Sequence, residues 1–595
     1  MSELDLAVIG NCNFSALVNM WGRIVWSCLP RVDGDPVFCS LLDKKGAEAE
    51  FGFCDIDLEN LSSTEQSYIP NTAVLVTRLY DTNGAGIEIT DFAPRFKQFG
   101  RMFRPAMVMR QLTPLKGHPR IRIRVRPAVN YGESQPEVSW GSNHIRYMLQ
   151  EQTLRLTTDA PVSMVREEVP FLLESPLSLI LGPHETFNGP IPMTVREFRE
   201  QTIDYWLEWV RYLAIPFEWQ NEVIRAAITL KLCNFEESGA IVAALTTSVP
   251  EAAGTIRNWD YRYCWLRDAF FVVHALNRLG ATRTMEDYLR YITNIAAGSV
   301  SGHLQPVYGV TYKAKLTERI VESLGGYQGM GPVRVGNQAY EHIQNDVYGS
   351  VILAATQMFF DQRLDAPGDE RMFALLERIG EQALGVWDSP DAGLWEFRHI
   401  ARVHTFSAVM CWVSCDRLAK IADRLRLVER AAYWHQNADK LHAEIDERAW
   451  NDEGGFYATA FDSDDVDASL LLIEQLGFVD AKDPKFAGTV EEIERKLKHG
   501  DMIYRYVTPD DFGLPETAFT VCTFWYIDAL AALGRKDEAR VLFEKLLSIR
   551  NHAGLLSEDV DTTTNQLWGN FPQTYSMVGI INTAMRLSKS WEEGL

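Results

Sequence analysis

Three segments of the sequence carry carboxylates, with aromatic rings inside the first two and, for the third, a short distance downstream in 569–573. They cover 257–268, 391–396 and 554–559, and the first packs four aromatic rings among two aspartates and three arginines. Aromatic faces stack on the apolar faces of sugar rings, and arginine and aspartate side chains exchange hydrogen bonds with neighbouring hydroxyl groups. The combination therefore predicts a carbohydrate-binding site.

Two glutamates in these segments are candidates for acid and base chemistry. Hydrolysis of a glycosidic bond needs a proton for the leaving oxygen and a second carboxylate that attacks or activates water. Glu396 follows Trp395, and an indole wall would raise the pKa of its carboxyl group and keep it protonated. Glu558 is then the candidate base. A single Trp-Glu pair is common on protein surfaces, so the recurrence of several such loops in one helical domain favours the assignment.

The residues that must position these loops divide into two regions of different periodicity. Over 1–195 apolar and polar residues alternate, as in 121–126, and turn residues such as those at 81–84 separate the runs. This region predicts an antiparallel β-sandwich. The basic residues Arg122, Arg124 and Arg126 suggest an anion groove, but the alternation explains them more simply as the solvated face of a half-buried strand.

From residue 196 the period changes to that of amphipathic helices. We assign 196–220 to a helical linker and 221–595 to a helical domain. The clearest predicted helices cover 197–213, 221–232, 265–280, 340–360, 370–386, 404–427, 429–448, 517–534, 536–548 and 572–588. With shorter candidates they number about a dozen, which can close into a ring of six inner and six outer helices, an (α/α)6 barrel.

Composition excludes several classes of function. The 595 residues are 46% hydrophobic and 23% charged, and 80 acidic against 58 basic side chains give a net charge of −22, which would repel nucleic acid and anionic membrane surfaces. No apolar run reaches the length of a membrane span, and no basic leader opens the chain, so a cytoplasmic location is expected. The nine cysteines form no CxxC or Cys/His pattern and are expected to be reduced core thiols without a metal.

The run 258–269 strongly resembles a signature of glycoside hydrolase family 15, the glucoamylases with their bacterial trehalase and glucodextranase relatives. Further matching segments follow the order of the family: 22–33, 304–309, 326–327, 332–337, 346–349, 554–558 and 569–573. The resemblance covers nearly the whole chain and implies a β-sandwich, a helical linker and an (α/α)6 barrel with a pocket for one terminal glucose.

The resemblance also implies roles for individual residues. The family acid follows a tryptophan, which corresponds to Glu396 after Trp395, and the family base corresponds to Glu558. The substrate-binding candidates carried over are Tyr261, facing the developing oxocarbenium ion, Trp265, walling the pocket, Arg267 and Asp268, holding hydroxyl groups, and Trp395, Glu516 and Arg334.

Family members invert the anomeric centre, so the two carboxyl groups should stand roughly 6.5–9.5 Å apart. No metal or organic cofactor is needed for this chemistry. The sequence departs from the family's usual residues at 19–21 and at 561–566, and these departures weaken any inference of the substrate from the family.

The leading functional prediction is an inverting, exo-acting α-glucoside hydrolase of glucoamylase type that releases β-glucose from small malto- or isomalto-oligosaccharides. The alternative is an α,α-trehalase on the same scaffold. A non-catalytic sugar-binding protein would have lost one of the two carboxylates, and a phosphorylase would need a phosphate site in place of Glu558. The expected partner is a small α-glucoside, and a homo-oligomer is compatible with the sequence.

Overall fold

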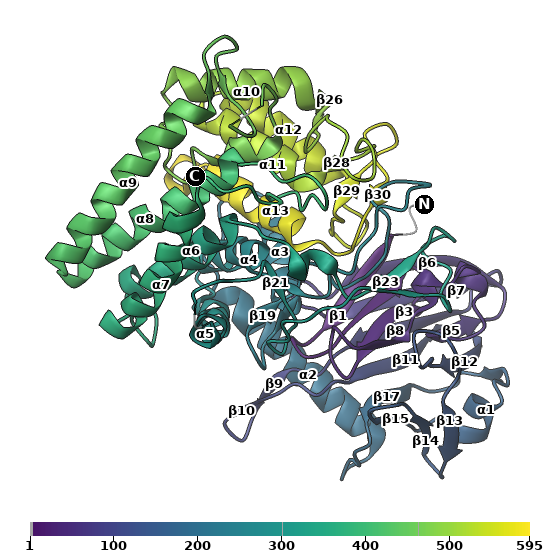
Figure 1. The fold of residues 1–595 in the computed structure, drawn as a ribbon. Coiled ribbons are helices and arrows are strands. Elements are labelled where there is room, and N and C mark those ends of the chain that lie inside the picture. Colours follow the sequence, from purple (N-terminus) through teal and green to yellow (C-terminus); the bar gives the residue numbers. More distant parts are fainter. Residues whose placement is uncertain (1–3, 300, 462, 595) are drawn as a thin grey trace.

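Two antiparallel sheets form the amino-terminal part of the chain in the computed structural model, which describes residues 4–299, 301–461 and 463–594 (Figure 1). One sheet has the order β1-β2-β3-β5-β12-β16, with β4 paired to β3. Its strands are β1 (Leu6–Gly10), β2 (Ser15–Asn19), β3 (Ile24–Leu29), β4 (Asp35–Phe38), β5 (Phe53–Leu58), β12 (Arg120–Arg126) and β16 (Phe171–Leu172).

The other sheet has the order β13-β14-β15-β17-β11-β8-β7-β6. Its strands are β6 (Leu61–Tyr68), β7 (Leu75–Asp81), β8 (Gly86–Phe92), β11 (Val108–Lys116), β13 (Glu137–Trp140), β14 (His144–Met148), β15 (Thr153–Thr158) and β17 (Leu177–Pro183). Side chains from both sheets, such as Ile56 and Leu112, are buried in one apolar core. The two sheets are therefore a sandwich.

Strand β12 shows how the sequence pattern builds this sandwich. Ile121 and Ile123 are fully buried, whereas the arginines at 122, 124 and 126, which alternate with the apolar residues, lie on the outer face. Each of these arginines pairs with a carboxylate, in the pairs Arg122–Asp57, Arg124–Asp55 and Arg126–Glu168. The alternation therefore marks a half-buried strand, and its charges are balanced within the sandwich.

One buried ion pair lies inside the sandwich itself. Arg110 on β11 donates from Nε and Nη2 to the two carboxylate oxygens of Asp91, at 2.7 and 3.0 Å, and both side chains are buried. Arg110 also donates to the carbonyl oxygen of Cys54 at 3.1 Å. The guanidinium thus ties three strands together from the core.

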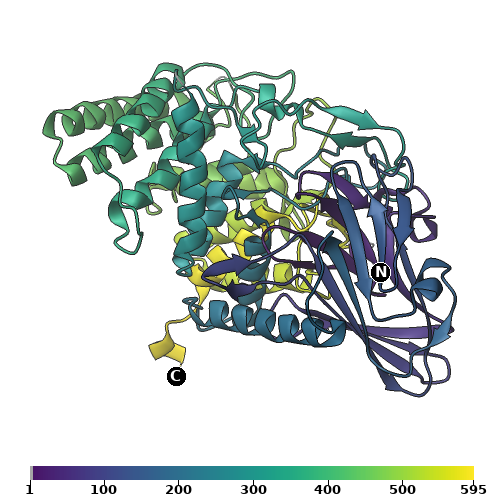
Figure 2. The ribbon, with the colours of Figure 1, turned by 90° about the horizontal axis from the view of Figure 1, so that it is seen from below.

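Helix α2 (Ile191–Arg211) follows the sandwich and lies along it, in contact with β17 and with the strand β9 (Phe96–Gln98) of a small hairpin (Figure 2). It buries Trp206 completely. The helix carries the chain from the sheets to the helical part of the molecule.

Contacts between the helices of the carboxy-terminal part define an inner ring and an outer ring, whose helices are labelled in Figure 1. In the inner ring each element packs against the next and the last packs against the first: α4 (Leu266–Arg278), α6 (Asp346–Phe360), α8 (Thr405–Leu425), the 3-10 turn η4 (Ala468–Leu472), α11 (Thr520–Ala532) and α13 (Thr574–Leu587). The outer elements are α3 (Gln220–Leu232), α5 (Thr282–Gly298), α7 (Glu370–Val386), α9 (Val428–Ala449), α10 (Pro484–Leu497) and α12 (Lys536–Ser548).

The two sheets and the two rings of helices confirm the predicted β-sandwich followed by an (α/α)6 barrel. Some predicted helix limits were wrong: the helix expected over 340–360 begins at Asp346, because 338–341 forms a separate 3-10 turn. Helices α5 and α10 lie outside the ranges given above. The fourth inner element is only the short turn η4, which is too short to show a helical period in the sequence.

The sandwich and the barrel share one continuous apolar core. Polar contacts also cross between them: Trp26 Nε1 of β3 donates to the carbonyl oxygen of Leu245 at 2.7 Å, and Asn551 Nδ2 donates to those of Leu4 and Leu6 at 2.9 and 2.8 Å. All nine cysteines are buried and free, and no described helix is long and apolar enough to cross a membrane.

Inner helices α6 and α8 approach each other closely at Gly349, and this contact gives a test of the packing. A Cβ built on Gly349 would lie 2.3 Å from the carbonyl oxygen of Met410. We expect Gly349→Ala to push the two helices apart and to destabilise the fold by about 1–3 kcal/mol. The control is Gly385→Ala in α7, where a Cβ meets nothing within 4 Å, and which should be neutral or stabilising by up to about 1 kcal/mol. Equal midpoints of thermal unfolding for the two variants would contradict the packing described.

Candidate active site

A cavity opens where the loops that precede the inner helices meet. Trp265 directly precedes α4, Phe519 precedes α11, and Gln573 caps α13 by accepting a hydrogen bond from the backbone of Tyr575. All of these residues line the cavity. Since the amino-terminal ends of helices carry partial positive charge, the barrel offers a favourable environment for carboxylates at this end.

Glu396 reaches the cavity from a tight turn between α7 and α8. Its φ of +63° is in the left-handed region, and Phe397 N donates to the carbonyl oxygen of Ala392 at 3.1 Å, as in the turn that usually ends on glycine. Carboxylate Oε1 accepts hydrogen bonds from Trp265 Nε1 at 2.6 Å, Gln344 Nε2 at 3.1 Å and Arg267 Nη2 at 3.4 Å. Oε2 accepts none from the residues described. The two oxygens of this carboxylate are therefore in different environments.

Glu558 approaches the cavity from another part of the chain and is almost fully buried, with 1% of its surface exposed. It immediately precedes β29 (Asp559–Val560) in a small sheet with β28 (Ala518–Phe519) and β30 (Leu567–Trp568). Oε1 accepts a hydrogen bond from the Tyr261 hydroxyl at 2.7 Å, and Oε2 accepts one from Asn570 N at 3.3 Å. Both oxygens are therefore held in place.

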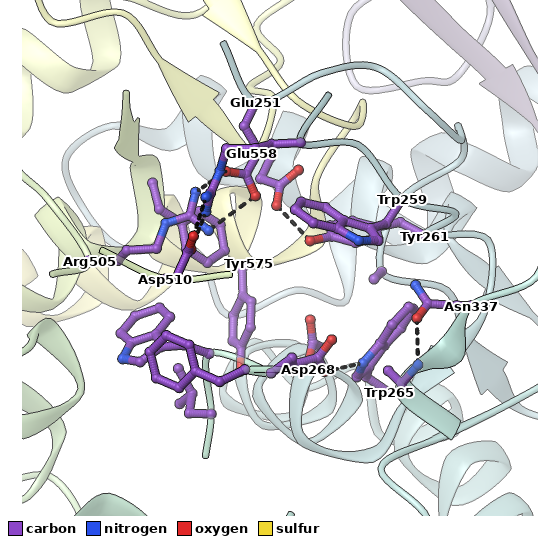
Figure 3. Close-up of a pocket in the computed structure, with 18 of the residues that line it drawn as sticks. Glu251, Trp259, Tyr261, Trp265, Asp268, Asn337, Arg505, Asp510, Glu558 and Tyr575 are labelled. Atoms are coloured by element: carbon purple, nitrogen blue, oxygen red, sulfur yellow. Dashed lines mark hydrogen bonds and ion pairs between the residues drawn. The ribbon is translucent and has the colours of Figure 1, made fainter. Parts of the chain in front are cut away.

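The short stretch 261–265 connects the two glutamates through hydrogen bonds. Tyr261 donates to Glu558, Trp265 donates to Glu396, and the two rings pack edge to face with centroids 5.4 Å apart. Figure 3 shows Glu558 with Glu251 and Arg505 on one side of the cavity, and Asp268 and Trp265 on the other. The structure thus brings both predicted glutamates to one cavity and keeps each on its own hydrogen-bond donor.

Further charged groups surround Glu558. Arg505 pairs with Glu251 at 2.9 Å and with Asp559 at 3.2 Å, and both of these carboxylates are buried. Burial together with the charges of Asp559 and Glu251 raises the pKa of Glu558 above its ordinary range, although Arg505 and the Tyr261 hydroxyl oppose the rise. The three carboxylates lie close enough to hold a metal ion, but Arg505 supplies the positive charge there. A carboxylate with a raised pKa is a stronger base.

Arg267 and Asp268 lie in the first turn of α4 at the other side of the cavity. Arg267 Nη1 donates to Gln344 Oε1 at 2.8 Å and to Asp346 Oδ2 at 3.1 Å. Its Nε lies 3.7 Å from Asp268 Oδ2, too far for a hydrogen bond, and both of these buried atoms have no hydrogen-bond partner among the residues described. Burial raises the pKa of Asp268 to about 7, despite the charge of Arg267. Unpaired buried polar atoms of this kind suit a site whose partner is a ligand hydroxyl.

Trp395 lines the cavity. Its ring packs against Tyr506, Phe519 and Trp525, with centroids 5.9, 6.4 and 6.3 Å away. The indole that hydrogen-bonds to Glu396 is that of Trp265. Trp395 therefore builds an aromatic wall of the cavity.

Two predicted pocket residues lie outside the cavity lining. The Glu516 side chain is exposed, and its backbone carbonyl accepts a hydrogen bond from the Tyr504 hydroxyl at 3.0 Å. Arg334 on β23 (Val333–Val335) pairs with Glu318 at 3.0 Å, and the other oxygen of Glu318 binds Arg398, which does line the cavity. Neither Glu516 nor Arg334 reaches the site directly, which corrects the expectation for both.

A family model described as glycosyl hydrolases family 15 matches residues 219–585. The chain belongs to this family. A second model, described as trehalase-like, N-terminal, matches residues 4–166. The resemblance noted in the sequence is thereby confirmed, and the protein is a glycoside hydrolase.

Several curated relatives are similar over nearly their whole length. A trehalase of Thermoplasma volcanium is 30% identical over 98% of this chain and 93% of its own, and a trehalase of Thermoplasma acidophilum is 30% identical over 97% and 98%. A trehalase of Mycobacterium tuberculosis is 29% identical over 99% and 90%. A crystal structure of a bacterial glucoamylase complexed with acarbose shares the fold, with a TM-score of 0.71 at 14% identity over 98% of this chain and 93% of that one.

The cavity of this family 15 protein also contains residues that were not singled out from the sequence. They include Glu251, His342, Arg398, Arg505, Tyr506, Asp510, Asp511, Phe512, Phe519, Trp525 and Tyr575. The run 504–512, with two tyrosines, an arginine and two aspartates, is similar in composition to the segment 257–268 and would have been the signal for part of this set.

The 510–513 turn forms part of the cavity wall. Asp510 accepts hydrogen bonds from Arg257 Nη1 and Nη2, both at 2.7 Å. Asp511 accepts from the backbone N–H groups of Arg398 and His399 at 2.6 and 3.1 Å. This turn is therefore fixed to the segment that follows Glu396.

The loop that carries Glu396 is anchored at its start by Asp391. Its Oδ2 accepts hydrogen bonds from Asn345 N at 2.7 Å and from the Ser407 hydroxyl at 2.8 Å, so it connects the starts of α6 and α8. Burial raises the pKa of Asp391 to about 7, although these two hydrogen bonds oppose the rise.

A glycine against Glu558 gives a test of the site. A Cβ built on Gly569 would lie 2.8 Å from Glu558 Oε2 and 2.5 Å from its Cβ. We expect Gly569→Ala to displace the carboxylate and to lower kcat for glycoside hydrolysis about 10-fold or more. Gly534→Ala is the control, because Gly534 also has a positive φ, of +82°, but a Cβ there meets nothing within 4 Å. Both variants should lose about 1–2 kcal/mol of stability, and a wild-type kcat for Gly569→Ala would contradict the geometry.

A second test concerns Asp391. The pKa of Asp391 is about 7 in the folded state and that of an unfolded aspartate is about 4. Between about pH 4 and pH 7 the folded state therefore keeps a proton on this carboxyl group that the unfolded state has lost. The contribution of this group to the free energy of unfolding is fully present below about pH 4 and is lost as the pH rises through about 7. Asparagine is neutral throughout, so the unfolding midpoint of Asp391→Asn should rise relative to wild type between pH 5 and pH 8. Asp452→Asn, at an exposed position, is the control, and a pH-independent difference for Asp391→Asn would refute the linkage.

Proposed function

We propose that the protein is an α,α-trehalase that hydrolyses trehalose to two glucose molecules with inversion. The observation that carries this proposal is that curated trehalases match 97–98% of this chain and 93–98% of their own length at 30% identity. The trehalase-like model over residues 4–166 agrees with it. The sequence alone had favoured malto- or isomalto-oligosaccharides, and the relatives support the alternative better.

Glu396 is proposed as the general acid. Three donors converge on Oε1, so the proton of the neutral carboxyl group belongs on Oε2, the oxygen without a hydrogen-bond partner among the described residues. That oxygen is then the one that faces the glycosidic oxygen of a bound sugar. The left-handed turn at Glu396 supports this role, because strained backbone of this kind is concentrated at functional sites.

Glu558 is proposed as the general base. Burial and the neighbouring carboxylates raise its pKa, which strengthens it as a base, while Tyr261 fixes one of its oxygens. Glu558 would take a proton from the water that attacks the anomeric carbon as Glu396 protonates the leaving oxygen. The carboxylates around the cavity would stabilise the positive charge of the oxocarbenium-like transition state.

Arg267 and Asp268 are proposed to bind hydroxyl groups of the first glucose. Arg267 is held by Asp346 and Gln344, and its Nε and the Oδ2 of Asp268 have no hydrogen-bond partner among the described residues. Trp395 and Trp265 would flank the same sugar. The second glucose of trehalose would then lie toward the mouth, between Arg398 and the 510–513 turn.

Stereochemistry provides the test of this function. Trehalose joins two α-glucose units through their anomeric carbons, so inversion at one centre releases one β-glucose and leaves the other as α-glucose. Proton NMR of the first products should therefore show equal amounts of both anomers, whereas retention would give α-glucose alone. Rates on maltose and isomaltose at the same concentration measure the glucoamylase-type alternative, and faster cleavage of either than of trehalose would overturn the trehalase proposal.

The roles of the two glutamates are tested by isosteric variants. Glu396→Gln cannot donate a proton and Glu558→Gln cannot accept one, so each should lose on the order of 10²–10⁴-fold in kcat. Both should unfold at nearly the wild-type temperature, because the amide preserves the shape of the side chain. Glu516→Gln is the control, since its side chain is exposed and outside the cavity lining. Wild-type rates for either variant at Glu396 or Glu558 would remove that residue from its role.

A further inference from the structure

The stretch around 261–265 that binds both glutamates has one face toward the cavity and an opposite face toward the β-sandwich. Around Tyr261 the chain is extended: Ala244 N donates to the carbonyl oxygen of Tyr261, and Ala243 N donates to that of Tyr263, both at 3.0 Å. Side chains alternate in such a segment. Tyr261 therefore faces the cavity, while Asp260 and Arg262 on either side of it face away and are completely buried.

Asp260 and Arg262 form a closed ion pair across Tyr261. Arg262 donates from Nε to Asp260 Oδ1 at 2.9 Å and from Nη2 to Oδ2 at 2.7 Å, and neither side chain is exposed. The backbone N–H of Arg262 also donates to Oδ1, at 3.1 Å. A planar guanidinium bound at two points fixes both position and direction, which a lysine cannot do.

The remaining donors of Arg262 are bound by the sandwich. Nη1 donates to the carbonyl oxygen of Gly34 at 2.7 Å and to Cys28 Sγ at 3.3 Å, and Nη2 donates to the Tyr131 hydroxyl at 3.5 Å. The guanidinium also lies 5.9 Å from the centroid of the Trp26 ring. A residue of the signature segment is thus bound both by its own segment, through Asp260, and by the amino-terminal domain.

We propose that Arg262 is a positioning residue through which the β-sandwich fixes Tyr261 against Glu558, so that the sandwich is a functional part of the active site. The inference rests on the proposed role of Glu558 as base. Arg262 does not line the cavity and acts only through the backbone of its neighbour.

The proposal predicts a specific change in pH dependence. Glu558 must be deprotonated to act as the base, so its ionisation defines the acidic limb of kcat/KM. The hydrogen bond from Tyr261 lowers the pKa of Glu558, as does Arg505, whereas Asp559 and Glu251 raise it. If Tyr261 moves away while the other three groups stay in place, the pKa of Glu558 rises and the acidic limb moves to higher pH.

The experiment compares two buried arginines in matched surroundings. Arg110 in the sandwich makes the same pattern of contacts as Arg262, with Nε and Nη2 on one aspartate and Nη1 on a backbone carbonyl and a cysteine sulfur, but neither Arg110 nor Asp91 lines the cavity. Arg262→Lys and Arg110→Lys should both lower the unfolding midpoint. Only Arg262→Lys should lower kcat, by about 10-fold, and move the acidic limb upward by about one pH unit.

A double-mutant cycle separates positioning from a general structural effect. Tyr261→Phe should give the same shift of the acidic limb, and adding Arg262→Lys to it should produce no further shift, because the hydrogen bond is already gone. Asp260→Asn weakens the same ion pair with an isosteric side chain, so it should shift the acidic limb in the same direction. If Arg262→Lys does not fold, Asp260→Asn tests the positioning role in its place.

Three outcomes would overturn the inference: a wild-type pH profile in Arg262→Lys and in Asp260→Asn, an equal loss of kcat in Arg110→Lys, or a full additional shift in the Tyr261→Phe background. Glu558→Gln is measured in parallel. If it is inactive while Arg262→Lys matches wild type, only this inference fails, and if Glu558→Gln is fully active, the proposed role of Glu558 fails first.

Discussion

Both candidate carboxylates depend on one short extended stretch, 261–265, that binds each of them at a different residue. Tyr261 donates to Glu558 at 2.7 Å and Trp265 donates to Glu396 at 2.6 Å, and the two rings pack against each other. Glu396 comes from the middle of the barrel sequence and Glu558 from near its end, so the two lie far apart along the chain. Their common reference is this stretch, which is held by the barrel on one side and by the sandwich on the other.

The barrel explains why the stretch can be so well defined. Its last residue, Trp265, directly precedes α4, an inner helix packed between α6 and α13, so this end of the stretch is fixed by a buried helix. The segments that approach it begin or end at inner helices as well, as Asp346 does at the start of α6. An inner ring that closes thus brings segments far apart in sequence to one point, even though its fourth member is only the turn η4.

Much of the fold and part of the site follow from local sequence patterns. Alternation and helical period predicted the sandwich and the barrel, because burial of one face repeats along each element. Glu396, Glu558, Arg267 and Asp268 stand in segments of unusual composition, and all four line the cavity. Arg505 and Glu251 could not be paired from sequence, since they are 254 positions apart and meet only when the barrel closes.

Two loop residues show the limits of sequence neighbours as a guide. Trp395 lines the cavity and packs against other aromatic rings, and the indole that hydrogen-bonds to Glu396 is that of Trp265. Glu516 was carried over from the family resemblance, yet the carboxylates of that loop which line the cavity are Asp510 and Asp511. The direction of a loop side chain is decided by its hydrogen bonds, which its neighbours in sequence do not show.

The charges around the cavity give the site a consistent chemistry. Six carboxylates and four arginines line it, and the buried Asp559 and Asp346 lie directly behind them. Because the arginines cannot neutralise every carboxylate, protonation is favoured at some of them, as the raised pKa values of Asp268 and Glu558 indicate. The same excess of negative charge stabilises a sugar cation more than a neutral sugar. The excess of carboxylates therefore favours both the raised pKa of the proposed base Glu558 and a transition state that gains positive charge.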